Sequence, residues 1–249
     1  MSGNTSRSKL FIRGILKSFP FLLLLIFRTG CVSAQDDLPD SIVTERLETI
    51  KQLLGEGKTN ANRWWYGWLI GYSAATVVQG TAIFISEDKS TRQDLALGAA
   101  TTFLGAAGQV INPMVPGYAP GRLELIPEST VEERLNKLSE AENLFRECAL
   151  MEKRGRSWKT HAIYSAVNLS SGLITWIGFD RSIWAGLGNF ALNTAITEAQ
   201  IFTQPTRAMK DYANYQKKYG MEPDNSYASN NTYWIVNVYP GGVVVRFVF

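Results

Sequence analysis

Residues that could act as acids, bases or nucleophiles are few in this sequence. His161 is the only histidine, and Cys148 is the only cysteine after residue 31. A zinc site needs three or four ligands, mostly His and Cys, so the sequence predicts no metal site. It also lacks a GxSxG nucleophile elbow and a GxxxxGK phosphate loop, and GLGNF at Gly186–Phe190 follows no predicted strand. These patterns predict no cofactor and favour a non-enzymatic protein.

Two carboxylates are the remaining candidates for acid–base chemistry. Asp94 and Glu198 each border an apolar segment, as the acids of a hydrolase or transferase could. Each also has a structural interpretation, because Asp94 can cap a helix and Glu198 can pair with Arg207. The sequence therefore predicts no catalytic residue, and an enzyme is the least favoured class.

Polar side chains interrupt segments that are otherwise apolar. The set consists of Gln79, Gln109, Asn168, Asn189, Asn193 and Glu198. Such groups cost free energy in an apolar environment unless they are hydrogen-bonded. We expect them to form a packing network, or to orient the head group of a lipid or other apolar ligand between two helical units.

Amphipathic helices precede these apolar segments. DSIVTERLETIKQLLGEG, residues 40–57, places Val43, Leu47, Ile50 and Leu54 on one stripe, with Gly55 or Gly57 ending the helix. The same design returns before Gly155, where Ser129 and Glu132 can form a capping box. The apolar face of this second helix comprises Val131, Leu135, Leu138, Phe145 and Cys148. Cys148 is therefore expected to be a core residue.

A pair of long uncharged runs follows each amphipathic helix. They are Trp64–Ile85 with Leu95–Gly121, and Thr160–Phe179 with Ser182–Thr197. Val-x-Glu-Arg-Leu, Trp and Pro landmarks recur at similar offsets in the two halves. The sequence thus predicts a mainly α fold, in which a duplicated three-helix unit (residues 35–125 and 126–220) forms a six-helix bundle.

The first 34 residues have the pattern of an export signal. Arg7, Lys9, Arg13 and Lys17 precede the short apolar core Pro20–Phe27, and Val32-Ser33-Ala34 resembles a cleavage site. A lipidated Cys31 is the alternative, although Arg28 argues against it. Removing the five basic residues of this segment from the chain's 25 leaves 20 against 22 acidic ones, in place of a net charge of +3. Nucleic acid is thus not an expected partner.

The four apolar runs raise the question of a membrane. Each is close to the roughly 20 residues that span a bilayer, and tryptophans lie near their ends. A cleaved signal would place the mature N-terminus outside, whereas the distribution of Lys and Arg favours that side as cytoplasmic. We expect an exported protein of the bacterial envelope, periplasmic or outer-membrane associated, whose hairpins pack together or lean on a membrane. An integral inner-membrane four-helix protein is the alternative.

Residues 221–249 are expected to form a linker and a β-hairpin. Pro240-Gly241-Gly242 suits a tight turn, and the apolar alternation that ends in Phe249 resembles the closing strand of outer-membrane barrels. The residues expected to dock are Tyr233, Ile235, Val245, Phe247 and Phe249. They could cap the helices, extend an envelope partner's sheet or join copies of the chain in a homo-oligomer.

One element carries a resemblance. QIFTQPT, Gln200–Thr206, follows a pair of apolar helices and is similar to an element of bacterial exported or membrane helical-hairpin proteins without an assigned function. The resemblance implies no activity. From the residues themselves we expect a membrane-associated scaffold or assembly protein, with binding of an apolar ligand as the second hypothesis.

Overall fold

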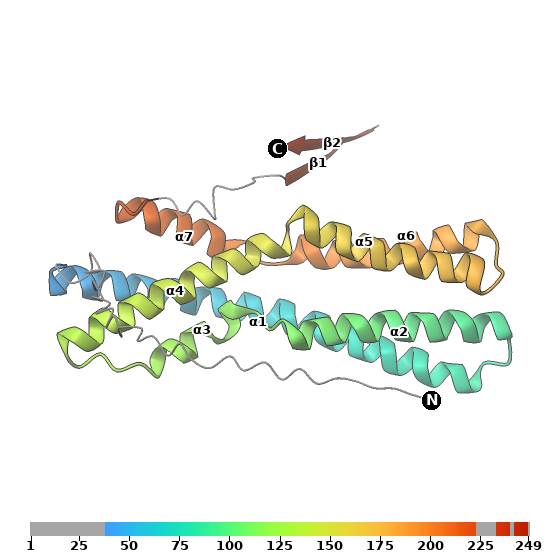
Figure 1. Cartoon of the computed structure of the whole chain (residues 1–249), viewed down its shortest axis with the longest axis horizontal. Coiled ribbons are helices and arrows are strands. Elements are labelled where there is room, and N and C mark those ends of the chain that lie inside the picture. Colours follow the sequence, from blue (N-terminus) through green and yellow to red (C-terminus); the bar gives the residue numbers. More distant parts are fainter. Residues whose placement is uncertain (1–37, 223–232, 240–241, 249) are drawn as a thin grey trace, which may run out of the picture. The chain divides into compact units, whose positions relative to one another are not determined.

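The structure is a computed structural model that describes residues 38–222, 233–239 and 242–248. It is mainly helical, as predicted (Figure 1). The helices are α1 (Asp40–Ile85), α2 (Lys89–Ile111), α3 (Val115–Glu124), α4 (Val131–Gly155), α5 (Trp158–Leu173), the π-helical turn η1 (Ile174–Gly178), α6 (Ile183–Thr203) and α7 (Arg207–Lys218). Two strands, β1 (Tyr233–Tyr239) and β2 (Gly242–Val248), pair antiparallel with Tyr233 opposite Val248.

The helix boundaries differ from the predicted ones in two ways. The first amphipathic helix does not end at Gly55 or Gly57, since α1 continues without a break through the following apolar run. Each glycine costs about 1 kcal/mol in a helix, but buried Leu54 and Ala61 on either side anchor the segment. In addition, short helices α3 and α7 follow Pro113 and Pro205, where a six-helix arrangement has none.

A compact core joins four of these helices, which we call the helical domain: residues 40–61 of α1 together with α3, α4 and α7. The stripe Val43, Leu47, Ile50 and Leu54 is buried as predicted, and so is Cys148. The core is completed by Ala119, Leu123, Leu138, Ala141, Leu144, Phe145, Ala149, Tyr212 and Tyr215. Val131, expected on the core face, is instead half exposed at the first turn of α4.

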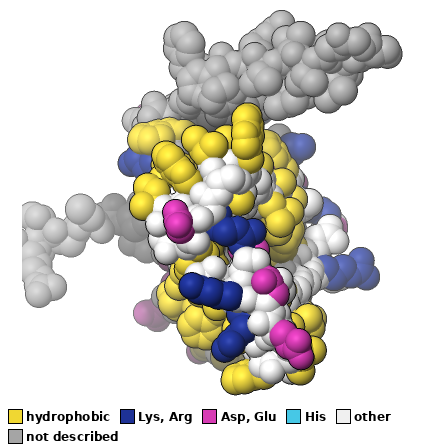
Figure 2. Space-filling view, turned by 90° about the vertical axis from the view of Figure 1, so that its right-hand side faces the viewer, with side chains coloured by type: hydrophobic (Ala, Val, Ile, Leu, Met, Phe, Trp, Pro, Cys, Tyr) yellow, Lys and Arg dark blue, Asp and Glu magenta, His cyan; other side chains and the backbone are white. Residues whose placement is uncertain are grey.

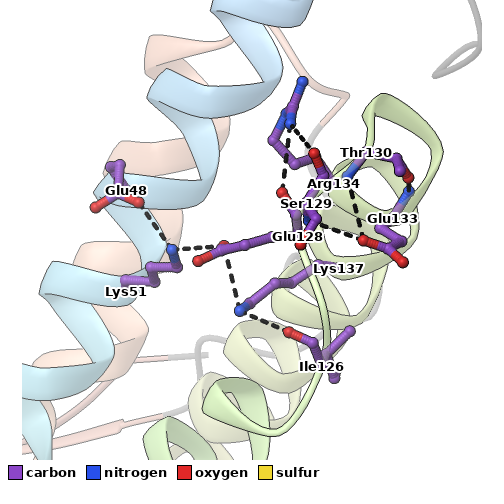
Figure 3. Close-up of polar contacts among 9 residues, drawn as sticks. All are labelled: Glu48, Lys51, Ile126, Glu128, Ser129, Thr130, Glu133, Arg134 and Lys137. Atoms are coloured by element: carbon purple, nitrogen blue, oxygen red, sulfur yellow. Dashed lines mark hydrogen bonds and ion pairs between the residues drawn. The ribbon is translucent and has the colours of Figure 1, made fainter.

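A capping box starts α4, one residue later than predicted (Figure 3). Thr130 Oγ1 accepts a hydrogen bond from the Glu133 N–H at 3.2 Å, and Glu133 Oε2 accepts from the Thr130 N–H at 3.1 Å. Ser129 contributes its own N–H to the same carboxylate at 2.8 Å. The helix therefore begins at Val131, because Thr130 and Glu133 satisfy the exposed amides of the first turn.

An ion-pair cluster links α4 to α1 beside this cap (Figure 3). Glu128 accepts from Lys51 at 2.7 Å and lies 3.2 Å from the ammonium of Lys137. Lys137, whose side chain is only 4% exposed, also donates to the Ile126 carbonyl at 2.8 Å. The buried ammonium thus has two oxygen partners, as a charge removed from water requires.

The apolar segments form two helical hairpins, shown on the right in Figure 1. The first consists of residues 62–85 of α1 with α2, and the second of α5, η1 and α6. Asp88 caps α2 by accepting from the Thr91 N–H at 2.7 Å, so Asp94 is not the cap that the sequence suggested. Asp180, with φ of 54°, makes the turn between η1 and α6.

Glycines allow α5 and α6 to approach closely. A Cβ on Gly186 would lie 2.7 Å from the Gly172 carbonyl oxygen and 2.9 Å from Trp176 Cβ, distances that force atoms to move. A Cβ on Gly172 would likewise lie 2.8 Å from the Gly186 carbonyl oxygen. Small residues at such crossings are typical of helix pairs that pack backbone against backbone.

We expect Gly186→Ala to destabilise the second hairpin by about 1–3 kcal/mol, the usual cost of overpacking. Gly188→Ala is the matched control, because a Cβ there meets no atom within 4 Å. Thermal unfolding of the purified protein, followed by circular dichroism in detergent, measures both. Equal melting temperatures for the two variants would contradict the close crossing.

Candidate functional site

The outer faces of the two hairpins carry large apolar side chains that nothing in the described chain covers. Val78 and Phe84 of α1 are 67% and 88% exposed, and Ile111 of α2 is 75% exposed. Ile177 and Trp184 in the second hairpin are 67% and 76% exposed. Figure 2 shows such hydrophobic side chains gathered on the surface, with charged groups between them. A water-soluble domain buries most residues of this kind.

Two stretches are long and apolar enough, by length and composition, to cross a membrane. They are Asp40–Ile85 and Lys89–Glu124, and in an apolar segment of 18 residues within each, only 6% and 11% of the residues are buried. Core helices of soluble proteins pass the same test of composition, but such helices are mostly buried. The low burial distinguishes these two stretches from core helices, while composition alone is weak evidence for a span.

Three of the expected polar residues meet between α5 and α6. Asn168, which is 4% exposed, donates to Thr197 Oγ1 at 2.9 Å. Asn189 Oδ1 accepts from Ser171 Oγ at 2.7 Å and from Asn193 Nδ2 at 3.0 Å. These contacts lie inside the second hairpin, where Asn189 and Asn193 bond to each other and to Ser171 and Asn168 bonds to Thr197, so the amides find partners within the helix pair.

The carboxylates considered for catalysis lie far apart. Glu198 pairs with His161, whose Nδ1 lies 2.9 Å from Glu198 Oε1, whereas Asp94 lies 3.4 Å from Arg181 at the opposite end of the hairpins. The distance along α6 between these two ends is roughly 22 Å at 1.5 Å per residue. The predicted partner of Glu198 was wrong, since Arg207 pairs with Glu56 and Asp211 instead. The two carboxylates therefore do not share a site.

The two glutamines of the first hairpin are separated from this network. Gln79 on α1 lies against Gly98 of α2, where its side-chain oxygen occupies the space above the glycine. Gln109 on α2 is 5% exposed, and its Nε2 has no hydrogen-bond partner among the residues that the structure describes. The six expected site residues thus divide among separate places, and Gln109 alone of them lines a cleft between the hairpins.

This cleft, which we call the seam cleft, has a volume of about 690 Å³. Its walls come from α1, the end of α2, α4, α5 and α6, where the hairpins meet the helical domain. Gln200 and Gln204 line it and are each 6% exposed. Both lie within the QIFTQPT element, and Gln200 Oε1 accepts from Tyr72 at 2.8 Å. The sequence pattern drew attention to this element without indicating that its glutamines face a cleft.

A second cavity of about 440 Å³ lies within the helical domain and is lined in part by Cys148 and Glu152. Glu152 is 2% exposed, and its Oε2 accepts from the Met209 N–H at 3.0 Å at the start of α7. Burial, together with Asp211, raises the pKa of Glu152 to about 7 against the lowering effect of the α7 amides and Arg156. No pattern in the sequence singled out this residue.

We expect the stability of the protein to fall as pH rises past the ordinary pKa of a glutamate. The folded state keeps the proton of Glu152 up to a pKa of about 7, whereas the unfolded chain loses it near 4.5. The loss should approach about 3 kcal/mol by pH 7, at roughly 1.4 kcal/mol per unit. Glu152→Gln should remove this dependence, while Glu132→Gln at an exposed position of α4 should keep it. Chemical denaturation at pH 5 and 8 measures the difference, and an unchanged pH profile in Glu152→Gln would refute it.

Metal ligands are not grouped in the part of the chain that the structure describes. Within the described ranges, no three His, Cys, Asp or Glu residues lie close enough together to hold a metal ion. The structure does not describe the side chains of the expected docking residues Tyr233, Ile235, Val245 and Phe247, nor any part of Phe249.

No family model matches this chain, and neither a curated protein nor a solved structure is significantly similar to it.

Proposed function

We propose that this protein is a membrane-embedded, non-enzymatic scaffold, in which two apolar helical hairpins lie in the lipid and carry the helical domain at one membrane face. The observation that carries the proposal is the exposure of large apolar side chains along both hairpins. In water such a surface would drive aggregation, whereas in lipid its exposure costs nothing.

Helix lengths support the proposal. α2 has 23 residues, α5 with η1 has 21, and α6 has 21. At 1.5 Å per residue these segments are roughly 31–35 Å long, close to the ~30 Å hydrocarbon thickness of a bilayer. Residues 62–85 of α1 have a similar length, so all four segments are long enough to span the membrane with a small tilt. Among the described residues, the two stretches of the first hairpin are also apolar enough by composition.

The placement of polar and aromatic groups agrees with this arrangement. The amides of Asn168, Asn189 and Asn193 point into a helix pair, where polar groups in lipid find partners. Trp64 and Trp68 each donate to Thr203 Oγ1 at 3.2 Å near the helical domain, at the level that an interfacial aromatic belt would occupy.

Charge favours one orientation. Lys89, Arg92 and Arg181 are the only basic residues at the hairpin tips, and the other Lys and Arg of residues 40–222 lie toward the helical domain. The positive-inside rule then puts the helical domain on the cytoplasmic face of an inner membrane. The basic leader of residues 1–17 belongs to the same side if it is retained. If the signal were cleaved and the helical domain exported to the bacterial envelope, the orientation would be the opposite one.

The duplication is part of the proposal. Residues 40–61 of α1 would correspond to α4, α2 to α6, and α3 to α7, with Pro113 and Pro205 before the last helix of each unit. The contacts of α1 with α3 and of α4 with α7 support this correspondence, because each amphipathic helix packs on the short helix of its own unit. Two related units would then share one core.

The scaffold role predicts that a partner, or a second copy of the chain, docks on the protein through the tail. The core of the helical domain lies within residues 38–222. Removing residues 232–249 should therefore leave the unfolding of the helices unchanged while abolishing the partner contact.

Alkaline carbonate extraction of membranes from cells expressing the chain tests the proposal. The protein should stay in the membrane pellet and dissolve only in detergent, as integral proteins do, while a peripheral protein is released. Release into the carbonate supernatant as a monodisperse protein would overturn the proposal.

A further inference from the structure

The helical domain gives way to the hairpins at one level of the molecule, where α1, α4, α5 and α6 come together (Figure 1). Arg156, just after α4, donates to the Phe202 carbonyl of α6 at 2.6 Å, and Trp64 of α1 donates to the Gln200 carbonyl at 3.2 Å. These contacts place the end of α4, the end of α6 and residue 64 of α1 side by side. In the proposed arrangement, this level meets the lipid headgroups.

Basic residues with exposed side chains gather at this level. They are Lys58, Arg63, Arg154 and Lys159, which we call the basic band. Arg63 directly precedes Trp64, and Arg154 and Lys159 lie on either side of Arg156 in the sequence. Lys58 precedes Arg63 on α1 by roughly 7.5 Å of helix. The headgroup layer on each side of a bilayer is roughly 5–7 Å thick, so the band and this layer have similar depths.

The charges of the basic band are not neutralised within the chain. The four side chains form no hydrogen bond or ion pair with any residue that the structure describes. Acidic residues nearby are already paired, since Glu56 accepts from Arg207 and Glu198 lies against His161. Exposed like charges without internal partners attract an anion from outside the chain.

The surface beside the basic band changes from basic to apolar in the direction of the hairpins. Tyr66 and Ile70 on α1 are 53% and 64% exposed, and Ile163 on α5 is 65% exposed. Trp158, next to Lys159, is 52% exposed at the start of α5. Basic and tryptophan side chains followed by apolar ones are typical of the boundary between lipid headgroups and acyl chains.

Both hairpins contribute to the basic band. Lys58 and Arg63 belong to the helix that enters the first hairpin, whereas Arg154 and Lys159 flank the junction that enters the second. A partner that contacts all four side chains must therefore extend along the bases of both hairpins. A layer of headgroups does so, and the apolar surface beside the band favours lipid over a nucleic acid.

We propose that the basic band binds the anionic headgroups of membrane phospholipids, in the leaflet that borders the helical domain. This inference rests on the proposed membrane location, because only a membrane-embedded chain holds the band at headgroup depth. Guanidinium and ammonium groups donate to phosphate oxygens, and an anionic leaflet attracts each of them. A zwitterionic headgroup binds more weakly, because its own cation repels the same side chains.

Native mass spectrometry of the full chain, delipidated in a non-ionic detergent, tests the proposal. The probes are dioleoylphosphatidylglycerol, which is anionic, and dioleoylphosphatidylcholine, which has the same acyl chains and a zwitterionic headgroup. We expect the chain to bind phosphatidylglycerol in preference to phosphatidylcholine. The preference should shrink at about 1 M salt, where charges are screened beyond about 3 Å.

Variants locate the site. Arg63→Gln and Lys159→Gln should each lower the preference about fivefold, the effect of one basic residue at an anionic membrane surface. Lys217→Gln is the matched control, because Lys217 is also exposed and without a partner among the described residues. It lies beside Lys218, which pairs with Glu45 at the opposite end of the helical domain. This variant should keep the preference of the parent chain, and circular dichroism checks that all three variants stay folded.

Equal binding of the two lipids by the parent chain would overturn the proposal, and so would a loss in Lys217→Gln as large as in Arg63→Gln. Displacement of phosphatidylglycerol by an equimolar DNA oligonucleotide would assign the band to a nucleic acid and overturn the lipid partner. Because these measurements are made in detergent, they can fail while carbonate extraction still shows an integral protein. A chain released by carbonate would instead overturn the membrane location itself.

Discussion

Phe145→Ala is expected to lower the free energy of unfolding of the helical domain by about 3–5 kcal/mol, the usual cost of truncating a buried phenylalanine. Phe145 is 1% exposed and lies edge-on to two rings, with centroid distances of 5.4 Å to Tyr212 and 5.7 Å to Tyr215. The side chain also borders the 440 Å³ cavity, so its removal enlarges an existing space instead of allowing the core to collapse.

Chemical denaturation of the purified chain, followed by circular dichroism, measures this loss. Val131→Ala is the control on the same helix, because Val131 is 50% exposed and its truncation should cost less than about 0.5 kcal/mol. A loss below about 1 kcal/mol for Phe145→Ala would mean that α4 and α7 do not share the core described above.

Breaking the buried ion pair between α1 and α4 should cost a similar amount, about 3–5 kcal/mol for either single change. Arg46 pairs with Glu142, and the two side chains are only 9% and 14% exposed. Tyr215 completes the cluster by accepting from Arg46 Nε at 3.0 Å and donating to Glu142 Oε1 at 2.5 Å. Arg46→Met or Glu142→Leu would leave the opposite charge buried and without its main partner.

The double variant Arg46→Met with Glu142→Leu separates this effect from simple loss of packing. Since neither charge then remains buried, it should be more stable than either single variant. The double-mutant cycle, measured by denaturation, gives the coupling between the two residues. Additive losses would show that the pair contributes no coupling.

The local parts of the fold could be predicted from the sequence. The stripe from Val43 to Leu54 and the buried position of Cys148 follow from helical spacing, and the structure confirms both. The end of the first helix could not be predicted, because Gly55 and Gly57 stop a helix only where nothing beyond them favours its continuation. Here the buried side chain of Ala61 and the apolar run after it keep α1 helical.

The site was harder to predict because it depends on partners far apart in the chain. The tendency of polar residues within apolar runs to pair was clear from composition, and Asn168 with Thr197 is an example. Which amide stays without a partner depends on tertiary packing, so the sequence could not distinguish Gln109 from Gln79. Glu152 could not be identified from the sequence for the same reason, since it becomes buried only when α7 folds back onto α4.

Cysteine labelling across the membrane tests the central claim most directly. In a Cys31→Ser background the remaining Cys148 is buried, and burial raises the pKa of its thiol, so it should not react. Single cysteines are introduced by Glu87→Cys at a hairpin tip, Lys217→Cys in α7 and Val78→Cys on the apolar face. A membrane-impermeant maleimide is then applied to intact and permeabilised spheroplasts.

We predict that Glu87→Cys is labelled in intact spheroplasts, Lys217→Cys only after permeabilisation, and Val78→Cys in neither. Labelling of Lys217→Cys instead of Glu87→Cys in intact spheroplasts would reverse the orientation and place the helical domain outside the cell. Labelling of Val78→Cys as fast as Glu87→Cys would put the apolar faces in water and contradict the membrane-embedded account.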